Sequence, residues 1–542
     1  MTLLLLFLFA IQTRADQAHR EWTQIRQPDG STMSVSLCGD EWHHYYINSD
    51  STIVAPGDDG VFRPVVGFSH LLRSPRGAIA ARRRMERRHY AVSVSTGNER
   101  RGLVLMVQFP DRSFLSDDSH SQWNAILNEE GYSQNGAPGS VHDYFMDQSN
   151  GLFNLKFDVI GPVTLSKSVY YYGQNDSNGD DLYMGELIEE AMGQVKDQLD
   201  LHTYDWDGDG KVDQLYILYA GYSENFAGND RRLLWPHEFW LSGYPAYPDG
   251  LRIGDVVVDT YACSGELYGM QSNQSAALSG LGTFCHEFSH CLGLPDFYGS
   301  DNIGPWDIMA SGNRNASGWC PAGYSAYERI FCGWMKPEQL TRPAAVRLME
   351  PLSEGGTAYM IRNECADVSV DEYYLLENRQ QRGWDRSLPG HGLLVFHVDY
   401  SQQAWDMNLV NEVYDHQRYR IISAAGADRY ASVNSAYPYL GKDSLTDYSV
   451  PPAKVFNRNT DNRLLMGKPI TNISESADGL LSFYFMGGID SGIAGVSHSP
   501  SGQPPQQFDL LGRRIAPLRR IKSNHSKTFY KPTIFTNKQL NL

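Results

Sequence analysis

Hydrophobic and polar residues are spaced along this chain in patterns that predict strands and helices together. Segments 103–109 and 214–220 are short apolar runs, typical of strands buried in a sheet. Between them, the apolar residues of segment 181–201 have helical spacing, which predicts a helix packed on that sheet. Beyond residue 340, strand-like segments such as 372–377 and 392–399 are separated by Pro/Gly turns. This pattern indicates an antiparallel β domain that ends near residue 485.

The N-terminal part of the chain has a different texture. Residues 1–15 start with a short apolar run and end in small residues where a signal peptidase would cut, so we expect a signal peptide. Alternating residues and turn signals between 16 and about 70 predict a small β-rich domain. The basic run 82–88 follows, either as a solvated basic helix or as the place where a pro-segment is cut. We favour a propeptide that covers residues 16–95.

Size and charge limit the classes of function. A chain of 542 residues can bury several cores, and 46 basic against 63 acidic residues give a net charge of −17. That balance argues against nucleic acid as the main partner. The N-terminal apolar run is too short to cross a bilayer and no other segment qualifies, so we expect no stable membrane insertion. The oligomeric state cannot be predicted from these features.

One segment carries most of the elements of a zinc hydrolase site. On a helix, His286 and His290 are one turn apart and project from the same face, so both imidazoles can reach one Zn²⁺. Glu287 would sit beside the metal, where a carboxylate can take a proton from water and pass it to a leaving amine. Gly293 suits the turn that ends such a helix, and that turn brings Asp296 back as a third ligand. Three protein ligands leave a fourth position open, which distinguishes catalytic from structural zinc. Peptide-bond hydrolysis is therefore the predicted chemistry.

A second element supports this interpretation. Segment 306–312 is a small-residue turn with Met309 at its centre, suited to form an apolar floor under the metal ligands. Taken alone, Met309 would be explained better by core packing.

The same residues follow the pattern His-Glu-x-x-His-x-x-Gly-x-x-Asp with a Met-turn, and the chain resembles the immune inhibitor A family of secreted zinc metallopeptidases. This family lies within the metzincin-like group. The resemblance extends over most of residues 101 to 400, through four further segments: 101–111, 143–153, 326–334 and 374–379. It implies a bacterial, secreted enzyme with a zincin-like catalytic domain of a twisted sheet and an active-site helix, and the favoured propeptide would make this enzyme a zymogen. It also implies Glu287 as general base and His286, His290 and Asp296 as zinc ligands.

Three further residues are candidates for roles around the site. Tyr324 is a guess for a donor that stabilises the oxyanion together with the metal. His397 and Asp399 are two apart on an expected strand and so point to the same face, where they could join a metal or substrate site. Hydrogen bonding is the favoured interpretation for this pair.

An acidic loop suggests a second cation. Residues 205–213 match the first nine positions of an EF-hand loop, with glycine at the sixth, but the twelfth position is Tyr216 instead of glutamate. A full EF-hand is therefore excluded. Two interpretations stay open, a plain acidic turn and a truncated Ca²⁺ loop with four ligands: Asp205, Asp207, Asp209 and Asp213.

The cysteines leave several arrangements open. Seven are present, an odd number, which permits one, two or three disulfides. Cys285 and Cys291 flank the expected zinc helix and are best explained by buried packing. Cys38 and Asp40 are candidates for a latency switch, because a thiolate or carboxylate from a pro-segment can occupy the open position of zinc. A turn in a small β domain explains the same two residues without a metal.

We therefore predict an α+β protein, a secreted or cell-surface zinc endopeptidase that acts on extracellular proteins or peptides. The alternatives are a zinc amidase or peptidase that acts on cell-wall peptides and a catalytically inert surface adhesin. The expected parts are a signal peptide (1–15), a propeptide (16–95), a zinc metallopeptidase domain (96–340), a β-sandwich-like C-terminal domain (341–486), and a linker with a tail (487–542).

Overall fold

The structure is a computed structural model, and it describes most of the chain between Trp22 and Gly488. Residues 1–489 form one compact unit, and a second unit, residues 490–542, lies outside the described residues. The predicted signal peptide, most of the basic run 82–88 and nearly all of the predicted tail also lie outside them. The described residues are 18, 22–57, 59–65, 83, 90–226, 228–272, 276–298, 303–411, 413, 415–426 and 435–488.

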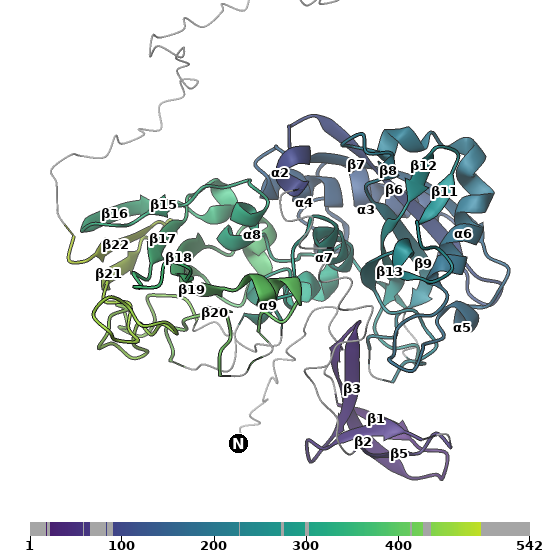
Figure 1. The fold of residues 1–542 in the computed structure, drawn as a ribbon, viewed down its shortest axis with the longest axis horizontal. Coiled ribbons are helices and arrows are strands. Elements are labelled where there is room, and N and C mark those ends of the chain that lie inside the picture. The colour runs from purple at the N-terminus through teal and green to yellow at the C-terminus, as the bar shows by residue number, and fades with distance from the viewer. Residues whose placement is uncertain are drawn as a thin grey trace, which may run out of the picture. The chain divides into compact units, whose positions relative to one another are not determined.

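A mixed sheet forms the centre of the segment predicted as the catalytic domain, residues 96–340 (Figure 1). Four of its strands run parallel, and the edge strand β10 is antiparallel to its neighbour β13. The segments predicted as buried strands, 103–109 and 214–220, are confirmed as strands β6 and β9. In sheet order the strands are β10 (His237–Trp240), β13 (Thr260–Tyr268), β9 (Leu215–Tyr222), β6 (Glu99–Gln108) and β7 (Asn154–Thr164), and β14 (Ala277–Leu278) also pairs with β13.

Both faces of this sheet are buried, which explains why β6 and β9 are continuously apolar. On β6, Leu103 and Leu105 belong to one hydrophobic cluster, and Val104 and Met106 belong to another on the opposite face. The first cluster is covered by helix α6 (Met184–Val195) and the second by three helices. These are α3 (Ser119–Asn128), α4 (Val141–Gln148) and α7 (Gly282–Cys291).

Helix α6 is the helix predicted at 181–201, but it is shorter at both ends. Its continuation consists of two 3-10 turns, Lys196–Gln198 and Leu201–Tyr204. Leu199 and Leu201 still pack against the same cluster as α6. The apolar spacing therefore extends beyond the helix because the following turns cover the same face of the sheet.

Two further sheets follow in the C-terminal part. Segments 372–377 and 392–399 are confirmed as strands, within β18 and β19. Alternate residues of β18 face opposite sides: Tyr373 and Leu375 join the cluster around α7, and Tyr374 and Leu376 join a separate cluster with the second sheet. The first sheet has the order β15 (Glu338–Gln339), β17 (Tyr359–Arg362), β18 (Asp371–Arg379), β19 (Gly392–Tyr400) and β20 (Tyr419–Ile421), and the second β16 (Ala344–Met349), β22 (Leu481–Phe485) and β21 (Ile470–Glu475).

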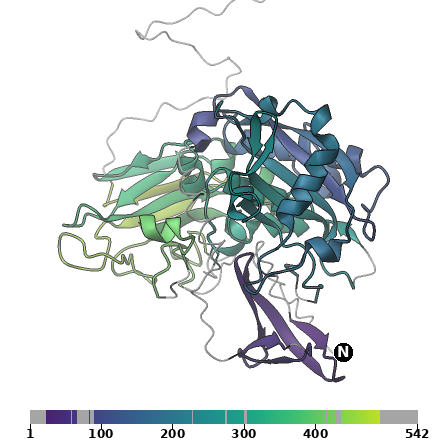
Figure 2. The same ribbon diagram turned by 45° about the vertical axis from the view of Figure 1, so that its right-hand side comes forward.

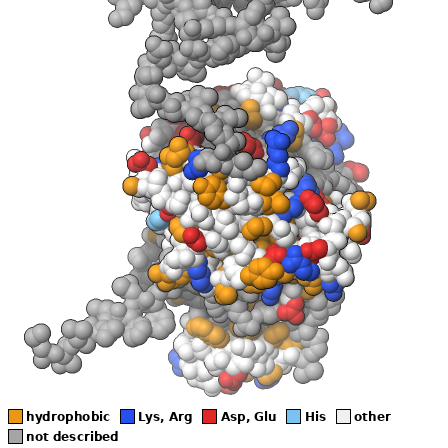
Figure 3. Space-filling model, turned by 90° about the vertical axis from the view of Figure 1, so that its left-hand side faces the viewer, with side chains coloured by type: hydrophobic (Ala, Val, Ile, Leu, Met, Phe, Trp, Pro, Cys, Tyr) orange, Lys and Arg blue, Asp and Glu red, His pale blue; other side chains and the backbone are white. Residues whose placement is uncertain are grey.

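Helix α7 consequently lies between the central sheet and the first C-terminal sheet (Figures 1 and 2). Its hydrophobic cluster includes residues on both sides of position 340, such as Phe288 and Leu375. On the C-terminal face drawn in Figure 3, hydrophobic side chains lie in small groups between acidic and basic ones. The described elements make the fold a mixed α+β arrangement, as predicted.

The N-terminal sheet is an antiparallel meander with a small core of its own, which confirms a β-rich segment for the described residues before position 66. Trp235, which lies in the predicted catalytic domain, belongs to that core. The strands are β1 (Thr23–Arg26), β2 (Thr32–Asp40), β3 (His43–Asn48), β4 (Ile53–Pro56) and β5 (Phe62–Pro64).

The remaining elements are short. A small sheet has the order β11 (Leu251–Ile253), β12 (Val256–Val258) and β8 (Lys211–Val212), and the short helices are α2 (Tyr90–Val94), α5 (Val169–Tyr172), α8 (Ala326–Phe331) and α9 (Gln402–Asp406). All seven cysteines lie in the described part and none of them is in a disulfide, so none of the one to three disulfides that the sequence permits is formed. Among the described helices, none has the length and apolar character needed to cross a bilayer.

A buried carboxyl group in the central sheet gives a test of this packing. Glu266 of β13 is buried and accepts hydrogen bonds from the backbone N–H of Leu115 (2.8 Å) and Gly221 (3.4 Å). Burial raises the pKa of Glu266 from 4.5 to about 7. The pKa of Glu266 is therefore higher in the folded protein, about 7, than in the unfolded chain, 4.5. Glu266 accordingly stabilises the folded state fully below pH 4.5, and this stabilisation is lost as the pH rises through 7.

Between pH 4.5 and 8, ionisation of Glu266 should lower the free energy of unfolding of the wild type by about 3 kcal/mol. We expect the Glu266→Gln variant not to show this decrease. Denaturant unfolding at several pH values measures the difference between the two proteins. The exposed Glu129→Gln serves as the matched control and should follow the wild type at every pH. Parallel curves for wild type and Glu266→Gln would contradict the burial of this carboxyl group.

Candidate metal centre

Helix α7 begins with a close backbone contact at Gly282 and is followed by a turn at Gly293, where the chain reverses direction. A side chain at Gly282 would place a Cβ atom 1.8 Å from the carbonyl oxygen of Asn313, so only glycine allows this approach. After the helix, Gly293 has φ +94° and donates its N–H to the carbonyl of His290 (2.8 Å). The predicted turn at Gly293 is thereby confirmed, and the chain returns past the helix at Asp296.

The structure brings the three predicted metal ligands together. The Nε2 atoms of His286 and His290 lie 3.4 and 3.2 Å from Oδ1 of Asp296. All three residues are almost fully buried, and their ligand atoms lie within 4.8 Å of one another. Bonds of about 2.1 Å to a tetrahedral Zn²⁺ would place two ligand atoms about 3.4 Å apart. This donor set therefore fits a single zinc ion.

The backbone fixes both imidazole rings for this role. Nδ1 of His286 lies 2.7 Å from the carbonyl of Ile308, and Nδ1 of His290 lies 2.7 Å from the carbonyl of Leu294. A carbonyl oxygen only accepts, so each Nδ1 carries the proton. Each Nε2 is then left with the lone pair that a metal needs.

Glu287 is buried on the same helix, next to the ligand face. At about 100° per residue, its side chain lies about 80° around the helix from the midpoint of the two histidines. Ser289 lies at a similar angle on the opposite flank. Its carboxylate therefore lies beside the three predicted ligands and not among them.

The Met-turn, residues 306–312, packs against helix α7 and contacts His286. Met309 is fully buried in the cluster around α7, and its carbonyl accepts from the N–H of Phe297 (2.7 Å). The neighbouring Ile308 supplies the carbonyl that orients His286. The turn therefore orients a predicted ligand, His286, through its backbone in addition to packing through Met309.

A buried pair of carboxyl groups anchors this turn. Asp307 accepts from the N–H of Met309 (2.8 Å) and from the hydroxyl of Tyr419 (3.1 Å), and it also accepts a hydrogen bond from Glu328. Burial raises the pKa of Asp307 to about 6. Burial, and then the charge of Asp307, raise the pKa of Glu328 well above its usual range. Glu328 is therefore the member that keeps the proton and donates.

Other predicted candidates lie in hydrogen-bond networks away from the metal ligands. The hydroxyl of Tyr324 lies 2.5 Å from that of Ser289, in the aromatic core on the flank opposite Glu287, and this placement does not support the oxyanion role. Nε2 of His397 lies 2.7 Å from Oε1 of Glu372, and Oδ2 of Asp399 lies 2.6 Å from Nε2 of His416. The hydrogen-bonding interpretation of His397 and Asp399 is confirmed.

The acidic loop brings together three of its four predicted ligands. Oxygens of Asp205, Asp207 and Asp209 lie within 4.8 Å of one another, whereas the carboxylate of Asp213 accepts from the N–H of Trp206. Asp205 also accepts N–H groups of the loop itself, including that of Gly208 at 2.8 Å and that of Gly210 at 2.9 Å. Calcium binding stays a prediction.

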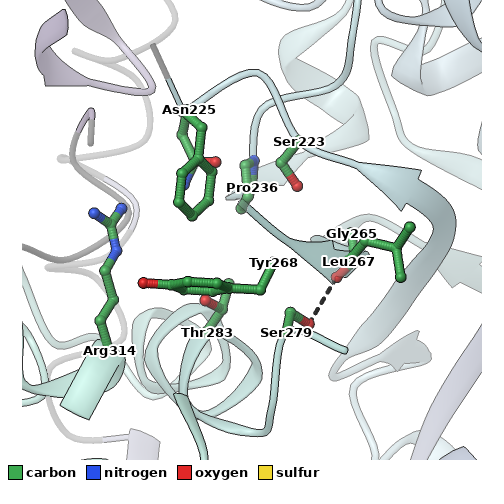
Figure 4. A pocket seen from close by; sticks show the side chains of 10 residues that line it. Ser223, Asn225, Pro236, Gly265, Leu267, Tyr268, Ser279, Thr283 and Arg314 are labelled. Carbon is green, nitrogen blue, oxygen red and sulfur yellow. Dashed lines mark hydrogen bonds between the residues drawn. The ribbon is translucent and has the colours of Figure 1, made fainter. Parts of the chain in front are cut away.

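A small cavity lies beside the first turn of α7 (Figure 4). Thr283, Tyr268 and Arg314 are among its lining residues, and the Arg314 guanidinium lies 5.7 Å from the ring centre of Phe226. Its volume of about 20 Å³ is room for one water molecule.

Sequence reasoning missed a residue that contacts one of the three predicted ligands, Asp296. The side chain of Asn408 is hydrogen-bonded to Asp296 across a separation of 112 residues. No local motif signals such a contact, because asparagine after a short helix is common in turns.

Comparison with known proteins identifies the domain that holds this site. The immune inhibitor A peptidase M6 catalytic domain matches residues 93–335. The pre-pro-metalloprotease PrtV of Vibrio cholerae serotype O1 is 25% identical over 303 residues, which cover 47% of this chain and 32% of that protein. Immune inhibitor A of Bacillus thuringiensis subsp. alesti is 24% identical over 271 residues, 42% of this chain and 39% of that protein.

The chain thus spans less than half the length of these relatives. The matched domain contains α7, the Gly293 turn and the Met-turn, and it ends before the C-terminal sheets. The predicted family is confirmed for this part of the chain: residues 93–335 match the immune inhibitor A peptidase M6 catalytic domain, and the relatives are named as a metalloprotease and as immune inhibitor A.

Proposed function

We propose that this protein is a secreted, zinc-dependent endopeptidase with a zincin-like catalytic domain. The observation that carries the proposal is the arrangement of two imidazole nitrogens and one carboxylate oxygen at 3.2 to 3.4 Å, buried in an M6 peptidase domain. The protonated Nδ1 atoms and the buried surroundings make the donor set suitable for Zn²⁺.

The chemistry divides between the metal and the protein. Zinc held by His286, His290 and Asp296 would lower the pKa of water and polarise the scissile carbonyl group. Glu287 would accept the proton of the attacking water and deliver it to the leaving amine. The carbonyls of Ile308 and Leu294 would keep both imidazoles oriented during this proton transfer.

Hydrolysis of a general protein substrate tests the proposal. The purified, activated protein should degrade casein, lose this activity with a zinc chelator, and regain it when zinc is added back. Release of fragments from purified cell-wall peptides, with casein untouched, would favour the amidase alternative. A protein that binds surfaces and cleaves neither substrate would favour the adhesin.

We further propose that the N-terminal sheet is a propeptide that lies against the site. Trp42, in the turn between β2 and β3, packs against His237 of the edge strand β10, with ring centres 5.7 Å apart. The adjacent Glu41 accepts a hydrogen bond from the hydroxyl of Tyr298 (3.2 Å), a residue close to Asp296 in the sequence. The turn therefore contacts both an edge of the sheet and the loop that carries the third ligand.

The two residues predicted as a latency switch lie in this same hairpin. Cys38 is buried in β2, and Asp40 accepts from the N–H of Trp42 (2.9 Å), which shapes the turn. Glu41 is the residue of this turn whose carboxylate accepts from Tyr298. A metal-binding role for Cys38 or Asp40 stays a prediction.

Cleavage of the precursor within residues 82–88 should raise peptidase activity by at least about tenfold, because it frees the β2–β3 turn to leave the site. Activity is measured on a short fluorogenic peptide before and after limited cleavage. Alanine at Cys38 or at Asp40 should activate the uncut precursor if that side chain binds the metal. An uncut precursor as active as the cut form would exclude a latency role for the segment.

A further inference from the structure

Asn408 holds Asp296 through two hydrogen bonds. The backbone N–H of Asp296 donates to Oδ1 of Asn408 (2.7 Å), and Nδ2 of Asn408 donates to Oδ2 of Asp296 (2.6 Å). Both residues are 3% exposed. A single amide therefore fixes the backbone and the carboxylate of the same residue.

These contacts give the two carboxylate oxygens of Asp296 different environments. Oδ2 accepts from Asn408, while Oδ1 lies 3.2 and 3.4 Å from Nε2 of His290 and His286. A carboxylate without this support can rotate and exchange its oxygens, since its terminal torsion is soft. The amide donor carries no charge and does not titrate, so it selects one oxygen for the metal without neutralising the carboxylate.

Asn408 is itself held rigidly. Its backbone has φ +51°, a left-handed conformation that asparagine tolerates better than most residues, and its N–H donates to the carbonyl of Trp405 (3.0 Å). Trp405 at the end of α9 is fully buried. The next N–H, that of Leu409, donates to Ala404 (2.8 Å). Asn408 therefore projects from a fixed turn.

We infer that Asn408 is a positioning residue for the metal centre: it holds Asp296 so that Oδ1 alone faces the two imidazoles. The inference rests on the proposed function, in which Asp296 is a zinc ligand. Asn408 lies beyond residues 93–335, so the C-terminal part supplies support that the M6 catalytic domain does not contain. Each of the three ligands is then oriented by a hydrogen bond: two backbone carbonyls orient the histidines, and one side-chain amide orients the aspartate.

A matched control is provided by Asn411. Its Nδ2 donates to the carbonyl of Phe297 (2.8 Å), and its Oδ1 accepts from the N–H of Tyr419 (2.9 Å). It is as buried as Asn408 and ties the same loop to the same C-terminal segment, but through the backbone. Loss of Asn411 reports on loop stability, whereas loss of Asn408 also releases the carboxylate.

The experiment compares zinc affinity in the full chain for the wild type, Asn408→Ala, Asn408→Asp and Asn411→Ala, by competition with a chelator. Asn408→Ala should bind zinc about ten- to a hundredfold more weakly, as expected for loss of a group that orients a ligand. Asn408→Asp keeps an acceptor for the N–H of Asp296 but sets a carboxylate against Oδ2. It should lose at least as much affinity as the alanine variant. Asn411→Ala should stay within a few-fold of the wild type.

A spectroscopic readout separates positioning from folding. In the Co²⁺-substituted proteins, the visible bands should change in both Asn408 variants, because Asp296 is free to bind through either or both oxygens. Asn411→Ala should keep the wild-type spectrum. If the alanine variant fails to fold, Asn408→Asp carries the same comparison.

Three results would overturn the inference. Wild-type zinc affinity and an unchanged cobalt spectrum in the Asn408 variants would do so while the proposed function stands. Equal losses in the Asn408 and Asn411 variants would reduce Asn408 to a loop contact. A wild-type protein that binds no zinc would overturn the proposed function, and this inference with it.

Discussion

Glu287→Gln should leave one zinc bound per chain while it lowers peptide hydrolysis by about a thousandfold or more. Glutamine has nearly the shape of glutamate but cannot accept a proton. The side chain projects beside the ligand face of α7, so the metal ligands should be undisturbed. Elemental analysis gives the zinc content, and a fluorogenic peptide gives the rate on the same sample.

The exposed Glu129→Gln is the control for this comparison and should keep the wild-type rate. Activity of Glu287→Gln within a few-fold of the wild type would show that another group accepts the proton. Loss of zinc together with activity would show instead that Glu287 supports the metal, and the assignment as general base would lose its basis.

Asp296→Ala should lower zinc affinity by about a hundredfold or more, because it removes one of three protein ligands. Zinc content is measured after dialysis against a weak chelator. Asp307→Ala is the comparison in the Met-turn. This variant loses the hydrogen bonds of Asp307 to Met309 and Tyr419. We therefore expect a lower thermal midpoint with little change in zinc content. Unchanged zinc in Asp296→Ala would mean that a different residue completes the site.

The grouping of His286, His290 and Asp296 was predictable to the extent that it is local in sequence. The two histidines share one helix face, and Gly293 reverses the chain within a few residues, so spacing alone brings Asp296 near them. The strands β6 and β9 were predictable for a related reason, because burial on both faces requires continuous apolar runs. These features depend on neighbours along the chain.

The parts that could not be predicted depend on neighbours in space. Asn408 meets Asp296 across 112 residues, and no periodicity announces such a pairing. Tyr324 was a guess from its position in the sequence, and tertiary packing places its hydroxyl against Ser289. The contact between Asp307 and Tyr419 could not be predicted either, because Tyr419 lies in the C-terminal sheet, far from Asp307 in the sequence.

The central claim is that His286, His290 and Asp296 hold one catalytic zinc ion. Anomalous diffraction from crystals of the protein, measured on both sides of the zinc absorption edge, tests it most directly. We expect one strong peak at about 2 Å from both Nε2 atoms and from Oδ1 of Asp296. No peak at that position in zinc-saturated crystals, or a peak only elsewhere, such as at the acidic loop 205–209, would contradict the account.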